Sequence, residues 1–146
     1  METEDNVLYH CGPVMRKEGE EWRIISAGPT TSIRMESLEK EFIERFGIRV
    51  IIGKGGMGKR TLQALQDNGA VYVHFTGGAG ALAAVGLGRV KNVYLLEKLG
   101  MAEAVWVFEA REFGPLVVAM DSKGASLYDI IDEETKSNLE RLLRGL

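Results

Sequence analysis

The chain contains few of the residues that support disulfide scaffolds or metal centres. Its 146 residues include one cysteine, Cys11, and two histidines, His10 and His74. A lone cysteine cannot form an internal disulfide, which suits a reducing cytoplasm, and it cannot by itself hold a cluster that needs several thiolate ligands. We interpret Cys11 as a small core residue and both histidines as isolated, with His74 a satisfied histidine inside or at the edge of a strand.

Long hydrophobic runs and an excess of positive charge are also missing. No apolar run reaches the roughly 20 residues that a membrane-spanning helix needs. The net charge of −3 gives no electrostatic reason to expect binding to nucleic acid. The N-terminal residues 1–5 are acidic and do not look like a signal or transit peptide. We therefore expect a cytoplasmic protein that binds neither membranes nor nucleic acid.

The overall composition is that of one ordinary globular domain spanning residues 1–146, with 45% hydrophobic and 27% charged residues. Glycine is abundant, at 18 residues, and it clusters at 53–58, 77–80 and 86–88. Glycine permits tight turns and close approach of two backbones. The clustering therefore indicates shaped loops rather than a flexible linker.

Helix and strand patterns alternate through the middle of the chain, which favours an α/β fold built in layers. Runs of β-branched and aromatic residues predict strands at 7–10, 22–27, 48–52, 70–75, 105–109 and 115–120. Helices are predicted at 35–46, 59–67 and 132–143. We expect the last two strands to pair with each other. We expect Asp132 to cap the last helix and its leucines to face inward, namely Leu139, Leu142 and Leu143.

The helix predicted at 35–46 has an apolar face and a charged face. Its charged residues, including Glu36 and Glu39, are assigned to solvent. Thr31 or Ser32 is the expected cap, because a short hydroxyl side chain satisfies a free N–H of the first turn. The residues expected to face the core recur at helical spacing: Met35, Leu38, Phe42 and Phe46.

Two stretches place anion-binding groups where a strand passes into a helix. Residues 26–35 contain Thr30, Thr31 and Arg34, and residues 53–57 contain Lys54 among glycines. A guanidinium holds a carboxylate with two parallel hydrogen bonds, an ammonium adds a point charge, and the free N–H groups of a helix start favour anions. The pattern predicts a site for a small carboxylate. The residues alone also allow a plainer interpretation, in which the threonines cap a helix and the arginine lies on the surface.

The order of six short segments resembles the β subunit, or C-terminal domain, of class I iron–sulfur hydro-lyases, the family of fumarase and L-tartrate dehydratase. The resemblance runs from about Tyr9 to Tyr128. Each segment is weak alone, and the six in this order are specific: Gly28-Pro29-Thr30-Thr31-Ser32 with Arg34-Met35, Gly53-Lys54-Gly55-Gly56-Met57, Gly77-Gly78-Ala79-Gly80-Ala81-Leu82, Glu97-Lys98-Leu99-Gly100-Met101, Glu103-Ala104-Val105-Trp106, and Asp121-Ser122-Lys123-Gly124 leading to Leu127-Tyr128.

The resemblance implies a layered β/β/α domain of the swivelling kind. It implies a 4Fe–4S cluster held by the cysteines of a separate α subunit, and a hetero-oligomer in which this chain closes over the site; self-association is the expectation for the chain alone. Members of the family usually carry an upstream segment with Arg-Asp and His-Lys-Arg that supplies another substrate arginine. We expect this chain to begin after that segment.

Carried over residue by residue, the resemblance puts Thr30 at the position that handles the C–H proton of the substrate. It puts Thr31, Arg34 and Lys54 at the substrate carboxylates. The implied reaction is the reversible hydration of fumarate to (S)-malate, with dehydration of L-tartrate as the related alternative. An isolated hydroxyl is a weak base, so Thr30 needs an activating neighbour or a cationic field.

Two glycine-rich segments also match nucleotide-binding patterns. Residues 53–61 follow a strand and precede a helix as a phosphate-binding P-loop does, but Arg60 stands where that motif needs Ser or Thr. Residues 78–83 match a dinucleotide fingerprint, or else close packing of a helix on a strand. A non-catalytic anion- or nucleotide-binding module, and a subunit that only completes an interface, therefore remain open as alternatives.

Overall fold

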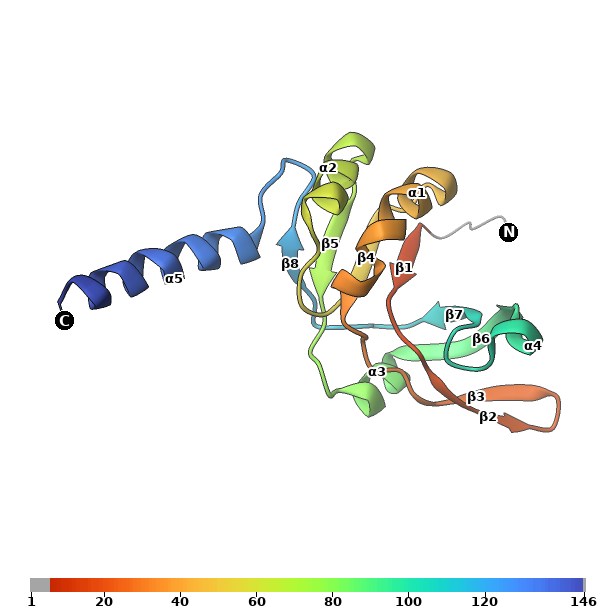
Figure 1. The fold of residues 1–146 in the computed structure, drawn as a ribbon. Coiled ribbons are helices and arrows are strands. Elements are labelled where there is room, and N and C mark those ends of the chain that lie inside the picture. The colour runs from red at the N-terminus through yellow and green to blue at the C-terminus, as the bar shows by residue number, and fades with distance from the viewer. Residues whose placement is uncertain (1–5, 146) are drawn as a thin grey trace.

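A computed structural model describes residues 6–145 as a mixture of helices and strands (Figure 1). The predicted α/β class is confirmed. Within the described residues, no helix combines the length and apolar character that crossing a membrane requires. The elements in chain order are β1 (Val7–Tyr9), β2 (Val14–Glu18), β3 (Glu21–Ser26), the 3₁₀ turn η1 (Ser32–Met35), α1 (Glu36–Phe46), β4 (Val50–Gly53), α2 (Lys59–Asn68), β5 (Val71–His74), α3 (Gly80–Gly86), β6 (Leu87–Tyr94), α4 (Leu96–Leu99), β7 (Val105–Ala110), β8 (Val117–Met120) and α5 (Leu127–Arg144).

The central sheet has the strand order β1-β4-β5-β8. Strands β1, β4 and β5 are parallel, and β8 closes the edge antiparallel to β5. Successive side chains of a strand point to opposite faces of the sheet. Ile51 and Tyr72 therefore belong to one core, while Ile52 and Val73 belong to another on the opposite face. Burial on both faces explains why these strands are continuous apolar runs rather than alternating ones.

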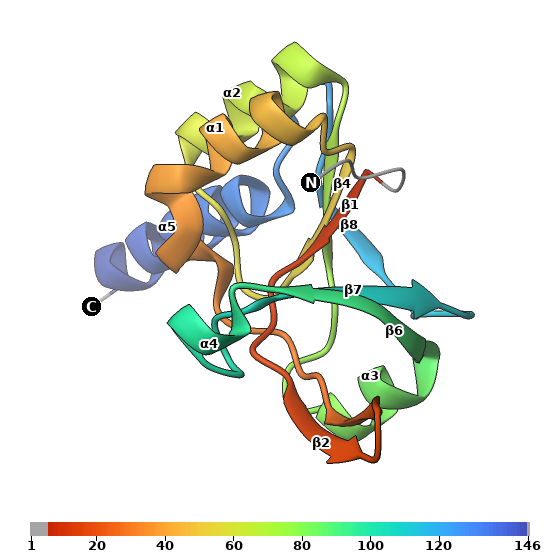
Figure 2. The same cartoon turned by 90° about the vertical axis from the view of Figure 1, so that its right-hand side faces the viewer.

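Helices α1 and α2 lie together on one face of the central sheet (Figure 2). We call the core between them and the sheet the helix-side core. Each of these helices ends at a glycine in the left-handed conformation, Gly47 for α1 and Gly69 for α2, where a side chain would be strained. The buried residues of the helix-side core are Ile43, Ile48, Ile51, Met57, Ala64, Leu65, Ala70, Tyr72, Ala119 and Met120.

The opposite face of the sheet carries a second layer of strands with helix α3 (Figure 2). This layer contains two antiparallel pairs, β2 with β3 and β6 with β7. We call the core beneath it the hairpin-side core; its buried residues are Ala27, Ile52, Val73, Phe75, Ala83 and Leu87. The two β layers and the helical layer match the layered arrangement that the family resemblance implies.

The prediction that the strands at 105–109 and 115–120 pair with each other is wrong. Strand β7 pairs with β6, whereas β8 pairs with β5 in the central sheet. The segment between them carries the chain from one β layer to the other. Strand β8 satisfies the backbone groups at the edge of β5 and buries Ala119 and Met120 in the helix-side core.

The start predicted for the last helix is wrong, and so is the prediction that its leucines face inward. Helix α5 begins at Leu127 and is capped by Ser126 rather than by Asp132, because Ser126 Oγ accepts a hydrogen bond from Asp129 N at 3.3 Å. The helix extends away from the body of the molecule (Figure 1). Its leucines face solvent instead of a core. Leu139, Leu142 and Leu143 are 54%, 69% and 62% exposed.

Helix α1 is rotated relative to the prediction. Leu38 is 68% exposed, whereas Glu39, assigned to solvent from the sequence, is 2% exposed. Ile43 takes the central apolar position and is fully buried. The apolar face of this helix therefore includes an acidic residue, and burial of a carboxylate requires a partner.

Candidate functional site

Three glycine-rich loops meet beyond the carboxyl ends of β4 and β5. Ala27 N donates a hydrogen bond to Gly80 O at 3.0 Å, and Thr31 forms a parallel bridge with Lys54. A Cβ at Gly77 would lie 3.4 Å from Cδ of Lys54, so the lysine stem runs beside the third loop. Ligands bind in α/β sheets at this end of parallel strands. The convergence makes this region the candidate site.

The backbone joins the predicted site residues into one turn. Thr30 N donates to His10 O at 2.8 Å, Ser32 N donates to Lys54 O at 3.1 Å, and Arg34 N closes the 3₁₀ turn on Thr31 O at 3.4 Å. The structure therefore brings Thr31 beside Lys54, with Thr30 and Arg34 on either side of Thr31. The side chains of Thr31 and Arg34 are exposed, and those of Thr30 and Lys54 are half-buried.

Among the described residues, the Arg34 guanidinium makes no ion pair and the Lys54 ammonium makes none either. A cation without an internal carboxylate partner is available to an external anion. The Thr30 hydroxyl likewise makes no hydrogen bond with the part of the chain that the structure describes, so no activating neighbour for it is found there.

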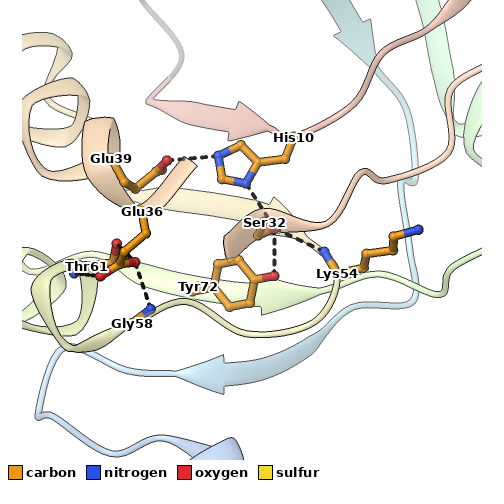
Figure 3. Close-up of polar contacts among 8 residues, drawn as sticks. All are labelled: His10, Ser32, Glu36, Glu39, Lys54, Gly58, Thr61 and Tyr72. Carbon is orange, nitrogen blue, oxygen red and sulfur yellow. Dashed lines mark hydrogen bonds and ion pairs between the residues drawn. The ribbon is translucent and has the colours of Figure 1, made fainter. Parts of the chain in front are cut away.

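The expected capping role of Thr31 or Ser32 is wrong. Thr31 precedes the 3₁₀ turn, but its side chain makes no capping hydrogen bond, and neither side chain caps α1. Ser32 is fully buried, and its Oγ lies 3.0 Å from His10 Nδ1 and 2.9 Å from the hydroxyl of Tyr72 (Figure 3). It also accepts a hydrogen bond from Lys54 N at 3.3 Å.

The interpretation of His10 as an isolated side chain is wrong as well. Its Nε2 lies 3.0 Å from Glu39 Oε2, and both side chains are buried (Figure 3). His10 is therefore the partner that the burial of the Glu39 carboxylate requires. No local sequence pattern identifies it, because 29 positions separate the two residues. Only the packing of α1 against the sheet reveals that Glu39 lies on the inner face of this helix.

Glu36 occupies the positions that a bound phosphate would need in the P-loop alternative. Its carboxylate accepts hydrogen bonds from Gly58 N at 2.7 Å, Thr61 N at 3.2 Å and Thr61 Oγ1 at 2.6 Å (Figure 3). These donors form the first turn of α2, where helix N–H groups and the helix dipole favour an anion. An internal carboxylate already fills this place, so the geometry does not favour nucleotide binding at residues 53–61.

The second nucleotide-like segment is explained by close packing. Gly28 and Gly80 pack backbone to backbone, and a Cβ at Gly80 would lie 3.2 Å from Gly28 N. The same Cβ would overlap Ser26 Oγ. Glycine at these positions lets two loops approach each other.

His74 and Tyr128 close the side of the site next to α5. His74 Nδ1 and the Tyr128 hydroxyl are hydrogen bonded at 3.0 Å, and His74 is half-buried at the end of β5, in agreement with its interpretation as a satisfied strand histidine. Burial raises the pKa of Tyr128 above its ordinary value. A Cβ at Gly56 would lie 3.0 Å from the Tyr128 ring, so the tyrosine packs directly on the Lys54 loop.

The described side chains do not fit a metal cluster. They contain no group of three or more His, Cys, Asp and Glu residues that could hold a metal ion. Cys11 is half-buried, and burial raises the pKa of its thiol to about 12. Because a cysteine ligates metal as the thiolate, this environment opposes ligation by Cys11.

Comparisons with known proteins identify the family to which this chain is similar. The model of the family described as "Fumarase C-terminus" matches residues 1–131. The chain is 47% identical over 139 residues to "Putative L(+)-tartrate dehydratase subunit beta" of Methanocaldococcus jannaschii, covering 95% of this chain and 71% of that protein. It is 45% identical over 134 residues to "L(+)-tartrate dehydratase subunit beta" of Escherichia coli K12, covering 92% of this chain and 65% of that protein.

A third relative carries a fumarase name. The chain is 47% identical over 137 residues to "Putative fumarate hydratase class I" of Geobacillus stearothermophilus. That match covers 93% of this chain but 26% of the relative. The chain thus corresponds to about two thirds of the separate β subunits and to about a quarter of the longer protein.

Proposed function

This chain belongs to the fumarase C-terminus family, and we propose that it is the β subunit of an iron–sulfur hydro-lyase that reversibly hydrates fumarate to (S)-malate. One observation carries the proposal. Thr31 and Lys54 pair through their backbones, and Arg34 follows in the same turn with no carboxylate partner among the described residues. Two cations and two hydroxyls near one loop junction suit a small dicarboxylate.

In this proposal the cationic side chains bind the substrate carboxylates. Arg34 holds one carboxylate through parallel N–H···O bonds, and Lys54 adds a point charge beside it. Removing the C–H proton next to a carboxylate builds negative charge on that carboxylate. Fixed positive charge stabilises the developing charge more strongly than the starting state, which lowers the barrier.

The threonines serve different roles in the same proposal. Thr31 donates a hydrogen bond to the substrate, and Thr30 transfers the C–H proton. The Thr30 hydroxyl makes no hydrogen bond with the residues that the structure describes, so it is available to substrate. The nearby Arg34 and Lys54 supply the cationic field that a hydroxyl needs to act as a base.

The cofactor of the proposed enzyme is a 4Fe–4S cluster on a separate, cysteine-bearing α subunit. Such a cluster supplies a Lewis acid for the hydroxyl that leaves or enters. The described residues of this chain offer no set of ligands for the cluster. In this proposal the role of the chain is to bind and orient the dicarboxylate. The proposed assembly is a cytoplasmic hetero-oligomer.

L-tartrate dehydration is the second candidate reaction. Two relatives that share 47% and 45% identity with this chain carry tartrate dehydratase β subunit names. Tartrate and malate each have two carboxylates and a hydroxyl on the carbon that loses it. The same cations and hydroxyls would bind either diacid, so the assay must compare both.

The test is anaerobic co-expression of the full chain with a candidate α subunit, followed by turnover assays with fumarate and L-tartrate. The α subunit assayed alone is the control. Turnover that needs both chains is the expected result, and the preferred diacid identifies the reaction. A complex that assembles with an intact cluster and converts neither diacid would overturn the hydro-lyase proposal.

A further inference from the structure

The Ser32 hydroxyl uses all of its hydrogen-bonding capacity inside the protein. A serine hydroxyl has one donor and two acceptor positions. Ser32 Oγ has contacts with Lys54 N at 3.3 Å, the Tyr72 hydroxyl at 2.9 Å and His10 Nδ1 at 3.0 Å. These partners come from the loop after β4, from β5 and from the segment after β1. One buried oxygen therefore connects three elements that surround the candidate site (Figure 3).

Counting donors assigns the direction of each bond. The Lys54 amide can only donate, and the Tyr72 hydroxyl lies closer to Ser32 Oγ than to its other acceptor, Gly55 O, at 3.2 Å. With both acceptor positions of Ser32 filled, its own proton goes to His10 Nδ1. The proton of His10 is then on Nε2, where it donates to Glu39 at 3.0 Å. Glu39 thereby sets the tautomer that orients Ser32.

The same hydroxyl sets the spacing between two loops that carry the predicted substrate residues. A Cβ at Gly53 would overlap Ser32 Oγ and would lie 2.8 Å from the Tyr72 hydroxyl. Gly53 therefore leaves room for Ser32 to reach beneath the Lys54 loop. The bond from Lys54 N and the return bond from Ser32 N to Lys54 O, at 3.1 Å, hold that loop against the Thr30–Thr31 turn.

We propose that Ser32 is a positioning residue, which holds Lys54 beside Thr31 so that the lysine can bind a substrate carboxylate. The buried His10–Glu39 pair orients the Ser32 hydroxyl for this role. This proposal rests on the hydro-lyase function proposed above. Ser32 does not touch substrate, because it is fully buried. Its effect passes through the Lys54 backbone, and a displacement of about 1 Å at a binding group is enough to weaken a site markedly.

The first test measures the loop without using activity. Hydrogen exchange is followed by mass spectrometry on the full chain in its complex, comparing wild type with Ser32→Ala. Peptides that contain Lys54 report the loop, and peptides that contain Ala70, whose N–H donates to Leu65 O at 2.9 Å, report the helix-side core. We expect exchange at Lys54 to accelerate about tenfold or more with little change at Ala70.

The second test measures substrate binding and turnover. For the assembled complex we expect Ser32→Ala to raise KM for the diacid about tenfold and also to lower kcat, by about threefold to tenfold, because Lys54 binds the substrate carboxylate and stabilises the charge that develops on it in the transition state. Ser137→Ala, at an exposed serine of α5, is the matched control and should leave both constants unchanged. A second variant, His10→Phe combined with Glu39→Met, removes the acceptor of the Ser32 proton without leaving a buried carboxylate unpaired. It should change exchange and KM in the same direction and provides the test if Ser32→Ala does not fold.

The outcomes distinguish this proposal from the function on which it rests. Faster exchange in Ser32→Ala that is confined to the Lys54 loop, together with a raised KM, supports the positioning role of Ser32. If exchange accelerates equally at Lys54 and at Ala70, the proposal is overturned, because Ser32 would then contribute only to the general stability of the domain. An unchanged KM also overturns it, because Ser32 would then have no effect on substrate binding. If the wild-type complex converts neither diacid, the hydro-lyase proposal fails, and the exchange comparison still decides whether Ser32 positions the loop.

Discussion

Ser32 and Lys54 are joined by two hydrogen bonds of opposite direction: Ser32 N donates to Lys54 O at 3.1 Å, and Lys54 N donates to Ser32 Oγ at 3.3 Å. The loop that follows β4 is thereby attached to the turn that carries Thr31 and Arg34. The first bond joins two backbone atoms, and the second joins the Lys54 backbone to the buried Ser32 hydroxyl, so the relative place of the two loops depends on that side chain as well as on the backbone. The following predictions depend on that geometry.

Substitution of Arg34 tests the proposed carboxylate grip. We expect Arg34→Met to raise KM for the diacid about tenfold to a hundredfold, because two charge-assisted hydrogen bonds are lost. Arg34→Lys should recover only part of the loss, since an ammonium cannot make the bidentate contact. Steady-state kinetics of the complex measure both, with Arg144→Met on exposed α5 as the control. Wild-type constants in Arg34→Met would favour the interpretation of this chain as an interface subunit.

The two threonines should separate in their kinetic effects. Thr30→Ala is expected to lower kcat by roughly a hundredfold or more, because general acid–base catalysis typically contributes that much. Thr31→Ala is expected to act mainly on KM. Thr30→Ser, which keeps the hydroxyl, should retain most of the activity. Turnover that survives Thr30→Ala would remove that residue from the proton-transfer step and leave its hydroxyl with a binding role at most.

Glu36 is predicted to stabilise the fold through the first turn of α2. Glu36→Ala leaves Gly58 N and Thr61 N without their carboxylate, which we expect to destabilise the domain by about 2 kcal/mol. For a domain of this size, that corresponds to a lowering of Tm by roughly 4–8 °C. Differential scanning fluorimetry of the variant against Glu44→Ala, an exposed glutamate of α1, provides the measurement. Equal Tm values would contradict this role.

The exposed leucines of α5 should contribute little to the stability of the isolated chain. Replacing Leu139, Leu142 and Leu143 by serine removes no core contact, because all three are more than half exposed. We expect Tm to change by less than about 2 °C, within the range usual for surface substitutions. A cooperative loss of stability would mean that α5 packs against the body of the protein in solution. Leu65→Ala, at a fully buried residue, is the positive control.

Cys11 should react slowly with alkylating reagents in the folded protein. Burial raises the pKa of its thiol from 9.0 to about 12, so the thiolate is scarce at pH 8. We expect alkylation by iodoacetamide at pH 8 to be at least about a hundredfold slower than in denaturant. The unfolded chain releases this proton near pH 9.0 and the folded chain near pH 12. This group therefore lowers stability as the pH rises through that window. Equal rates in native and denatured protein would contradict the burial.

The elements that the sequence predicted well are those with strong local patterns. The β-branched run Val50–Ile52 became β4, and the helix expected at 59–67 became α2 with Leu65 buried. The two stretches chosen for their hydroxyls and cations lie side by side, since Thr31 bridges Lys54. Local periodicity and glycine-rich junctions carried these inferences, because they depend on neighbours within a few residues.

The errors arose where packing chose between alternatives that look equal locally. The pattern of α1 allowed Leu38 to face inward, but the helix instead buries Glu39 against His10. Strand β7 pairs with β6 and strand β8 pairs with β5, because the edges of both β layers carry backbone groups that need hydrogen-bond partners. An apolar face on α5 did not imply a partner for that face within the described residues.

The sequence by itself determined the α/β class, the positions of the glycine loops and the four candidate residues Thr30, Thr31, Arg34 and Lys54. Only the tertiary structure decided which polar groups support them. Tyr72 and Ser32 are 40 positions apart, and His10 and Glu39 are 29 apart. Contacts across such separations depend on how layers pack, because the hydrogen-bonding demand of a buried group is met by whichever partner the fold brings within reach.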